Sequence, residues 1–191
     1  MTHPVRFVIS DDLRRSRLTV CFRLFLALPH YVWATLWAYG IATLVPFQWL
    51  SAIFAGRLQP DVHGFLTRFA RYHVHLYAYL FLLADPWPRF NGNPGYPVDL
   101  DVGGPERQRR LTVLFRLVLA IPALVFASVL STVLALLGVF GWFAALAIGR
   151  MPEGMAELGA YCLRYQTQTY AYLLLLTPRY PTLAGGARAS G

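Results

Sequence analysis

The apolar positions of this chain are gathered in two long runs, whereas an amphipathic helix of a soluble domain shows a narrow apolar stripe. The runs extend from residue 18 to 55 and from 111 to 148, and each contains one charged residue, Arg23 or Arg116. About 20 predominantly apolar residues are enough for a helix to cross a bilayer. Because each run has 38 residues, the pattern predicts an all-α membrane protein and argues against a soluble domain.

The second run is a copy of the first. When the sequence is shifted by 93 residues, it aligns with itself without a gap, with 31 identities over the 85 positions from 4 to 88. LTVCFRLFLALP falls on LTVLFRLVLAIP, and the Gly-Arg pair at 56–57 falls on the pair at 149–150. Self-similarity at a fixed period indicates a repeat architecture. We therefore predict a first membrane repeat at 1–89, a linker at 90–96, a second membrane repeat at 97–183 and a flexible C-terminal tail at 184–191.

Both repeats have the same predicted order of segments. A short segment with alternating apolar residues, 5–9 or 98–102, has the period of a surface strand. These two segments either pair with each other or serve as extended linkers. An arginine cluster, the long apolar run, a Gly-Arg turn and a closing helix, about 65–84 or 158–177, follow in each repeat.

The prolines of the long runs bear on the number of membrane crossings. Proline suits the first turn of a helix and disfavours a helix interior, so Pro29 and Pro122 are expected break points. In one interpretation, an interfacial amphipathic helix precedes each proline and a single crossing follows it. In the other, each run folds into a hairpin of two crossings.

Positive charge favours two crossings per repeat. All 17 basic residues are arginines, the formal net charge is +8, and equivalent arginine clusters precede both runs. Positive residues prefer the cytoplasmic side of a membrane. We therefore predict about four transmembrane helices in two tandem parallel repeats, related by an axis along the membrane normal, with both termini cytoplasmic. Arginines that flank apolar segments in this way argue against binding to nucleic acid.

Three segments carry a resemblance to a known family. RLTVLFRLVLAIP at 110–122, GWFAALAIGR at 141–150 and YAYLLLLTPRYP at 170–181 resemble the bacterial domain-of-unknown-function family DUF4389. The resemblance covers nearly the whole chain as two tandem copies. It implies a helical, multi-pass integral protein of a bacterial plasma (inner) membrane whose role is unknown, and it supplies no catalytic or ligand-binding residues.

Arg23 and Arg116 occupy equivalent positions inside the two apolar runs. Charged side chains in membrane segments are costly and often functional. We expect this pair to bind the phosphate of an anionic phospholipid or a partner protein; the alternative is an interfacial segment whose guanidinium groups reach the headgroups. A carboxylate partner has to come from the ends of the runs, such as Asp85 or Asp99. Four more arginines complete the predicted contact surface: Arg14, Arg17, Arg107 and Arg110.

The closing helices have a polar side. Arg71 and His75 are four residues apart, as are Arg164 and Gln168, so each pair shares a helix face. His73 and Gln166 lie on a different part of the same helices. Such residues either line a polar pathway or make hydrogen bonds between helices.

The sequence contains no motif typical of an enzyme, a cofactor site or a metal site; its five histidines form neither HExxH nor CxxCH. We predict a non-enzymatic scaffold or accessory subunit that contacts anionic phospholipid, within a membrane protein complex or a homo-oligomer. The alternative is a small oligomeric transporter or channel, a class in which internal repeats are common.

Overall fold

The computed structural model describes residues 5–9 and 13–183, so the predicted tail at 184–191 lies outside the described residues. The chain is mostly helical, as predicted, with two short strands. The elements are β1 (Val5–Ile9), α1 (Arg17–Ala55), α2 (Pro60–Leu80), β2 (Val98–Val102), α3 (Arg110–Leu114), α4 (Arg116–Ile148) and α5 (Glu153–Leu173).

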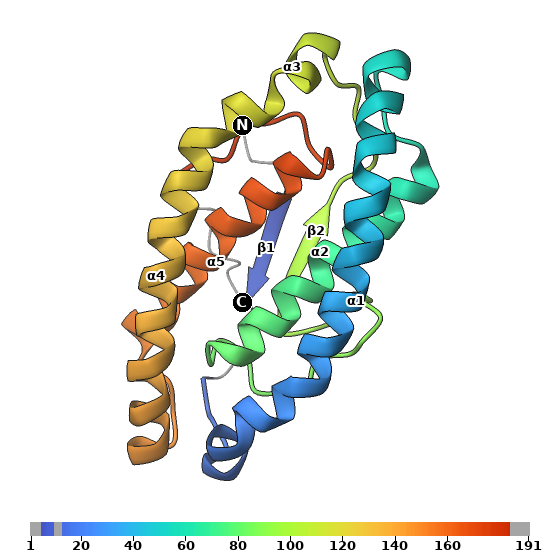
Figure 1. The fold of residues 1–191 in the computed structure, drawn as a ribbon. Helices are drawn as coiled ribbons and strands as arrows, with labels where there is room; N and C mark the ends of the chain where they lie inside the picture. Colours follow the sequence, from blue (N-terminus) through green and yellow to red (C-terminus); the bar gives the residue numbers. More distant parts are fainter. Residues whose placement is uncertain (1–4, 10–12, 184–191) are drawn as a thin grey trace.

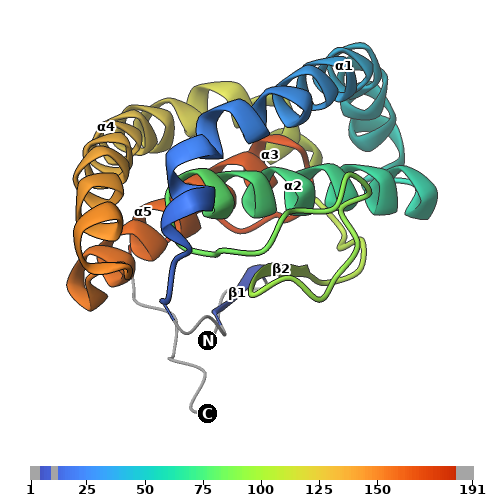
Figure 2. The same ribbon diagram turned by 90° about the horizontal axis from the view of Figure 1, so that it is seen from below.

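Each layer of the fold contains one element of each repeat. Figures 1 and 2 show α1 and α4 on one face of the molecule, α2 and α5 in the middle, and β1 with β2 on the opposite face. The hydrophobic core lies between the layers, where Leu66 and Val74 of α2 are buried in one cluster with Leu134 of α4 and Leu163 of α5.

The long helices continue through the prolines that were expected to break them. Pro29 and Pro46 lie inside α1, and Pro122 lies inside α4. The expected break at Pro29 and Pro122, with an interfacial segment before it and a crossing after it, is therefore wrong, and the alternative of a hairpin within each run is wrong as well. A proline removes one hydrogen bond from a helix, and the apolar helix-forming residues on both sides outweigh that loss here. The second run is interrupted instead at Phe115, which separates α3 from α4.

Both long helices end at a glycine in the left-handed conformation. The φ angles of Gly56 and Gly149 are 71° and 72°. The amide of each glycine donates a hydrogen bond of 2.9 Å to the carbonyl four residues earlier, in Ala52 or Ala145. Glycine is the residue that adopts this conformation most readily. The predicted Gly-Arg turn is therefore confirmed as the end of each apolar run.

A narrow stripe of each long helix is buried, and the stripe recurs in the second repeat. Most buried positions are three or four residues apart, which places them along one side of a helix. They are positions 20, 23, 27, 30, 34, 41 and 52 in the first repeat and 113, 116, 120, 123, 127, 130, 134, 141 and 145 in the second. Most of the remaining surface of both helices is apolar and at least partly exposed.

Among the described residues, two helices are long and apolar enough to cross a membrane, α1 and α4. The prediction of four transmembrane helices is therefore not supported. The closing helices α2 and α5 have 21 residues each, but charged residues interrupt their apolar character. These are Asp61, Arg68 and Arg71 in α2 and Glu153, Glu157 and Arg164 in α5.

The two repeats hold each other's helix ends. The backbone N–H of Arg15, just before α1, donates to the carbonyl of Gly149 at the end of α4, with a distance of 3.0 Å. The N–H of Gln108, just before α3, donates in the same way to the carbonyl of Gly56, with a distance of 2.8 Å. As Figure 1 shows, α1 and α4 consequently run in opposite directions. The predicted parallel orientation is wrong for these two helices.

The strands β1 and β2 pair with each other, which resolves the alternative that the sequence left open. The pairing is antiparallel, with Phe7 opposite Leu100 at its centre. Because these two residues are 93 positions apart, the pairing is symmetric. An approximate two-fold axis that exchanges the repeats therefore passes through this pair. Since each layer contains equivalent elements, the axis passes through all three layers.

Candidate functional site

Arg23 and Arg116 contact the carboxyl-terminal ends of the closing helices. Nη1 of Arg23 donates to the carbonyls of Tyr79 at 2.5 Å and Ala84 at 3.2 Å, and the guanidinium lies 4.4 Å from the centre of the Tyr79 ring. Arg116 donates to the equivalent carbonyls of Tyr172 and Thr177, at 2.7 and 3.3 Å, and lies 4.3 Å from the Tyr172 ring. These are cation–π distances.

This environment changes the expectation for the pair. The side chains of Arg23 and Arg116 are 2% and 0% exposed. Carbonyl groups at the end of a helix carry partial negative charge and suit a cation. Because the guanidinium groups are enclosed by the protein, they have no surface to offer a phospholipid phosphate. The geometry favours a structural role for both arginines, and lipid contact stays a prediction for the arginines that are exposed.

The two buried arginines differ in one partner. Nη2 of Arg23 makes a salt bridge of 2.6 Å to Oδ1 of Asp85, one of the carboxylates that the sequence put forward. The position equivalent to Asp85 is Pro178. Within residues 13–183, the hydrogen bonds of Arg116 go to backbone carbonyls.

Arg15 is a third buried arginine, which the sequence did not distinguish from its neighbours. It is 4% exposed, and its Nε and Nη2 donate to the carbonyl of Leu82 at 2.9 and 2.8 Å. Gln108 takes its place in the second repeat and donates to the carbonyl of Leu175. The replacement of one arginine by glutamine between the repeats was the available signal that this position faces inward.

The other arginines of the predicted contact surface are exposed and lie at two ends of the molecule. Arg14 pairs with Arg150 in an isolated bridge, so it lies where α4 ends. Arg17 donates to the carbonyl of Ala147, at 3.0 Å. At the other end, Arg110 donates to the carbonyl of Phe54, at 2.9 Å. Arg107 is exposed in the segment just before α3.

Arg71 and His75 share one side of α2, as predicted, and both contact Asp99 of β2. Nε of Arg71 lies 3.2 Å from Oδ1 of Asp99, and Nε2 of His75 lies 3.0 Å from it. Burial raises the pKa of Asp99, but hydrogen bonds from His75 and from the amides of Gly95 and Leu100 outweigh burial and hold that pKa below its ordinary value. This cluster fixes the strand pair against α2.

Arg164 and Gln168 are buried on α5, at 8% and 2% exposure. The guanidinium of Arg164 lies 5.2 Å from the ring of Tyr161. Oε1 of Gln168 accepts a hydrogen bond of 3.0 Å from the amide of Thr182. Both closing helices therefore use their polar side to bind segments of the chain itself, which agrees with the structural interpretation of these residues.

The family model described as Domain of unknown function (DUF4389) matches the chain twice, at residues 17–91 and 110–184. The chain belongs to this family. The two matches confirm the predicted tandem copies, and they begin at Arg17 and Arg110, where the helices α1 and α3 begin. Each DUF4389 copy thus contains a long apolar helix and its closing helix, and each strand precedes its copy. No curated protein and no solved structure matches the chain.

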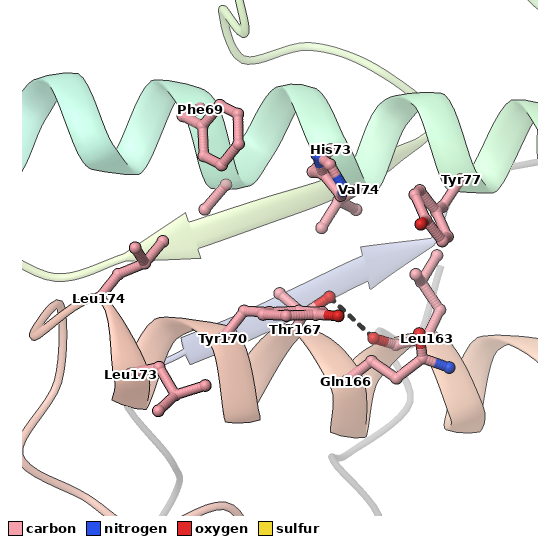
Figure 3. Close-up of a pocket in the computed structure, with 11 residues that line it drawn as sticks. Phe69, His73, Val74, Tyr77, Leu163, Gln166, Thr167, Tyr170, Leu173 and Leu174 are labelled. Atoms are coloured by element: carbon pink, nitrogen blue, oxygen red, sulfur yellow. Dashed lines mark hydrogen bonds between the residues drawn. The ribbon is translucent and has the colours of Figure 1, made fainter. Parts of the chain in front are cut away.

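A cavity of about 300 Å³ lies where the closing helices of the two DUF4389 copies face each other. Five side chains of α2, five of α5 and Leu174 line it, and β1 and β2 pass behind it (Figure 3). The lining is mainly apolar and aromatic. His73 and Gln166, which line this cavity, each contain a buried polar atom, Nδ1 and Nε2, that has no hydrogen-bond partner among the described residues.

Among the described residues of the two DUF4389 copies, no group of three or more His, Cys, Asp or Glu side chains is arranged to hold a metal ion. Cys21 is exposed and Cys162 is buried, and both are free thiols. The features from which a function can be inferred are therefore the exposed apolar face, the exposed arginines and the cavity between the copies.

Proposed function

We propose that this protein is a non-enzymatic scaffold or accessory subunit of the bacterial plasma membrane. In this proposal α1 and α4 lie within one leaflet, parallel to the membrane plane. The closing helices and the strand pair then lie at the cytoplasmic headgroup side, with exposed arginines in contact with anionic phospholipid. The observation that carries the proposal is the apolar surface of α1 and α4.

The apolar surface is too extensive for a soluble monomer. Phe25, Phe47 and Phe54 of α1 are 71%, 71% and 74% exposed, and Val118 and Phe140 of α4 are 63% and 62% exposed. Monomeric soluble proteins rarely expose contiguous apolar patches larger than a few hundred Å². Transfer of such side chains from water into hydrocarbon is favourable.

The length of the long helices supports an orientation along the membrane. A straight helix of 39 residues, as in α1, is roughly 58 Å long, and the hydrocarbon core of a bilayer is only about 30 Å thick. A helix with its side chains is about 10–12 Å wide, which fits within one leaflet.

The polar parts of the fold support the same orientation. Asn91 and Asn93 of the linker and Asp101 of β2 are exposed. Within the part of the chain that the structure describes, β2 pairs with β1 alone. Exposed loops and open sheet edges do not occur in hydrocarbon. If α1 and α4 crossed the bilayer, the layers beside them would be drawn into it. With the long helices in the plane, these layers lie in headgroups or water.

The arginines are also better accommodated in the plane. The exposed clusters lie at opposite ends of the antiparallel pair α1 and α4. A crossing would put equal clusters on both sides of the membrane, against the usual preference of positive residues for the cytoplasmic side. In the plane, both clusters reach the same anionic surface, which attracts each basic residue by roughly 1 kcal/mol. Since helices within one leaflet provide no path across the bilayer, this orientation favours a scaffold over a transporter or channel.

Single cysteines test the orientation. In a background in which the exposed Cys21 is replaced by serine, we would introduce Arg57→Cys, Arg150→Cys and Asn93→Cys separately. Each is labelled with a membrane-impermeant maleimide in intact spheroplasts and in inverted vesicles. Phe25→Cys is the control: in hydrocarbon it should react only after detergent is added.

The three arrangements give different patterns of labelling. The in-plane proposal expects all three positions to react in inverted vesicles alone. Two antiparallel crossings would make Arg57→Cys and Arg150→Cys react from opposite sides. Four crossings would place both of these positions opposite Asn93→Cys. If Phe25→Cys reacts fully without detergent, the apolar face is covered by neither lipid nor protein, and the membrane proposal fails.

A further inference from the structure

We propose that the cavity between α2 and α5 binds one acyl chain, with the carbonyl oxygen of its ester or carboxyl group accepting hydrogen bonds from Gln166 and His73. This inference rests on the proposed membrane function, because the hydrocarbon around α1 and α4 would supply the chain. The nearest sources are a phospholipid and a free fatty acid, which present the same chemistry to the site.

The cavity is a shared feature of the two repeats. His73 and Gln166 are 93 residues apart, as are Tyr77 and Tyr170, so the cavity is lined by equivalent positions from both copies. It therefore lies at the approximate two-fold axis, where one copy faces the other. Its volume of about 300 Å³ is at the lower limit of the range for sites of small molecules. A single slender chain suits this space better than a bulky ligand does.

The lining selects for an apolar occupant. Phe69, Ala70 and Val74 of α2 and Leu163 and Leu173 of α5 line the cavity, and Figure 3 shows the two helices on opposite sides of it. Apolar cavities remain dry and bind apolar molecules, whereas a bound water needs two to four polar partners. The walls thus favour hydrocarbon over a chain of waters.

Two polar atoms supply hydrogen-bond donors for the carbonyl oxygen at the polar end of an acyl chain. Gln166 is 5% exposed, and within residues 5–9 and 13–183 its Nε2 has no hydrogen-bond partner; the same holds for the buried Nδ1 of His73. Leaving a buried donor unsatisfied is unfavourable. Burial also lowers the pKa of His73, so the imidazole is neutral, and one of its tautomers carries the proton on Nδ1. A carbonyl oxygen has two lone pairs, so one oxygen has the capacity to accept from two donors.

In the proposed membrane orientation, the cavity lies at the depth of the lipid carbonyl groups. Figure 2 shows that α2 and α5 form the layer next to α1 and α4, on the side away from the apolar face. The boundary between hydrocarbon and headgroups, where lipid carbonyls lie, then falls at this layer. Figure 1 shows α2 and α5 between the separated helices α1 and α4, and Tyr170 is 53% exposed at the cavity. We place the entrance for the chain at this exposed side chain.

Photolabelling tests the site directly. The purified full-length protein in mild detergent is irradiated with a fatty acid that carries a diazirine on its chain, and separately with phosphatidylglycerol that carries the same group. Mass spectrometry of the peptides locates the label. We expect label on the segments 69–77 and 163–174, removed by excess decanoic acid for the fatty-acid probe. Whichever probe labels these segments identifies the source of the chain.

Two variants separate binding in the cavity from general contact with lipid. Ala70→Phe fills the cavity and should reduce label in these segments at least ten-fold. Gln166→Met keeps the size of the side chain, removes the amide and should weaken competition by decanoic acid about five-fold, the effect of one lost hydrogen bond. Ala42→Phe, on the exposed side of α1, is the matched control and should leave the label unchanged.

The outcomes bear separately on the two proposals. Label confined to α1 and α4 would overturn the acyl-chain site while leaving the membrane orientation intact. The same follows if Ala70→Phe does not reduce the label in the cavity segments and Gln166→Met does not weaken its competition by decanoic acid. Since labelling is carried out in detergent, a negative cysteine experiment would not prevent labelling of the cavity. If Ala70→Phe fails to elute as a single species in size-exclusion chromatography, Gln166→Met decides the result.

Discussion

Three of the buried arginines owe their position to backbone carbonyls that the folded chain leaves at the ends of α2 and α5. Leu82 and Leu175 have φ angles of 61° and 62°, so the chain turns sharply after each closing helix. The turn leaves carbonyl groups pointing inward, and Arg23, Arg116 and Arg15 donate to them. Unpaired carbonyls in a buried position would be costly. At the residue scale, these guanidinium groups therefore complete the fold.

Replacement of Arg116 should therefore reduce stability without affecting lipid retention. We expect Arg116→Met to lower the free energy of unfolding by about 3 kcal/mol, because hydrogen bonds from a charged donor to two carbonyls are lost. The double variant Arg14→Gln with Arg107→Gln should do the opposite, leaving stability nearly unchanged and reducing the anionic phospholipid that co-purifies. Denaturant unfolding in detergent and lipid mass spectrometry measure the two quantities.

A matched change of charge elsewhere is the control for lipid retention. The double variant Arg68→Gln with Arg89→Gln also removes two positive charges, but from exposed positions outside the clusters. It should retain the lipid. If Arg116→Met loses anionic lipid while its stability is unchanged, the original lipid interpretation of this residue is correct and the structural interpretation is wrong.

At this scale, the sequence identifies which arginines are equivalent, but it does not show that their side chains point into the protein. The equivalence of Arg23 and Arg116 was visible from the repeat alone, and Asp85 was a foreseeable partner. Their inward direction depends on turns at 82–84 and 175–177, whose left-handed leucines have no signature in the sequence. Leucine rarely adopts positive φ, so these turns were not predictable from residue preferences.

At the scale of the elements, β2 is bound to the closing helix α2 through charged side chains. Asp99 receives contacts from Arg71, His75 and two backbone amides, and these hold its pKa below the ordinary value. A carboxyl group whose pKa is lower in the folded state than in the unfolded state stabilises the fold above its ordinary pKa, near 4. That contribution is lost as the pH falls through the folded pKa.

We therefore expect Asp99→Asn to lower the free energy of unfolding by about 2 kcal/mol at pH 7, the value of one hydrogen bond to a charged group. The difference from the unmodified protein should shrink as the pH falls below about 4, where the carboxyl group of the unfolded state becomes protonated, and should vanish below the lower pKa of the folded state. Thermal unfolding in detergent between pH 7 and pH 2.5 measures this. Asp101→Asn, an exposed change in the same strand, should follow the unmodified protein, and equal behaviour of the two variants would contradict the role of Asp99.

The elements themselves were largely predictable, but their interruptions were not. Long apolar runs with few breakers predicted the long helices, and glycine at 56 and 149 predicted their ends. Pro29 and Pro122 were misleading because a long apolar helix tolerates the loss of a hydrogen bond. The second halves of the closing helices are aromatic and apolar, which is typical of membrane spans, although Asp61 and Arg68 argue against that interpretation.

At the scale of the whole molecule, the repeats form one unit rather than two independent domains. Each long helix ends against the segment that precedes the other long helix, and the strands pair across the axis. The pairs from Arg17 to Ala147 and from Arg110 to Phe54 repeat this exchange with side chains. Separation of the repeats would expose both helix ends at once, so we expect unfolding to be cooperative.

Cleavage of the linker tests this cohesion. With a protease site inserted after the exposed Asn93, the two fragments should elute together after cleavage and unfold in a single transition. The fragment 94–191 expressed alone should aggregate, because its strand and helix ends lack their partners. Separate elution of soluble fragments, or two transitions in the intact chain, would show that the repeats are independent domains.

The reciprocal contacts across the two-fold axis also have a consequence for ancestry and assembly. A chain with only one copy of the unit would meet every one of these contacts by pairing with a second molecule, because a two-fold contact is self-complementary. The tandem chain thus has the form of a homodimer joined into one polypeptide. Once joined, its halves are free to diverge, which a homodimer cannot do. The pairs Asp85 and Pro178, Arg15 and Gln108, and His73 and Gln166 are such divergences, and the last gives the central cavity two different polar groups where a symmetric dimer would have two identical ones.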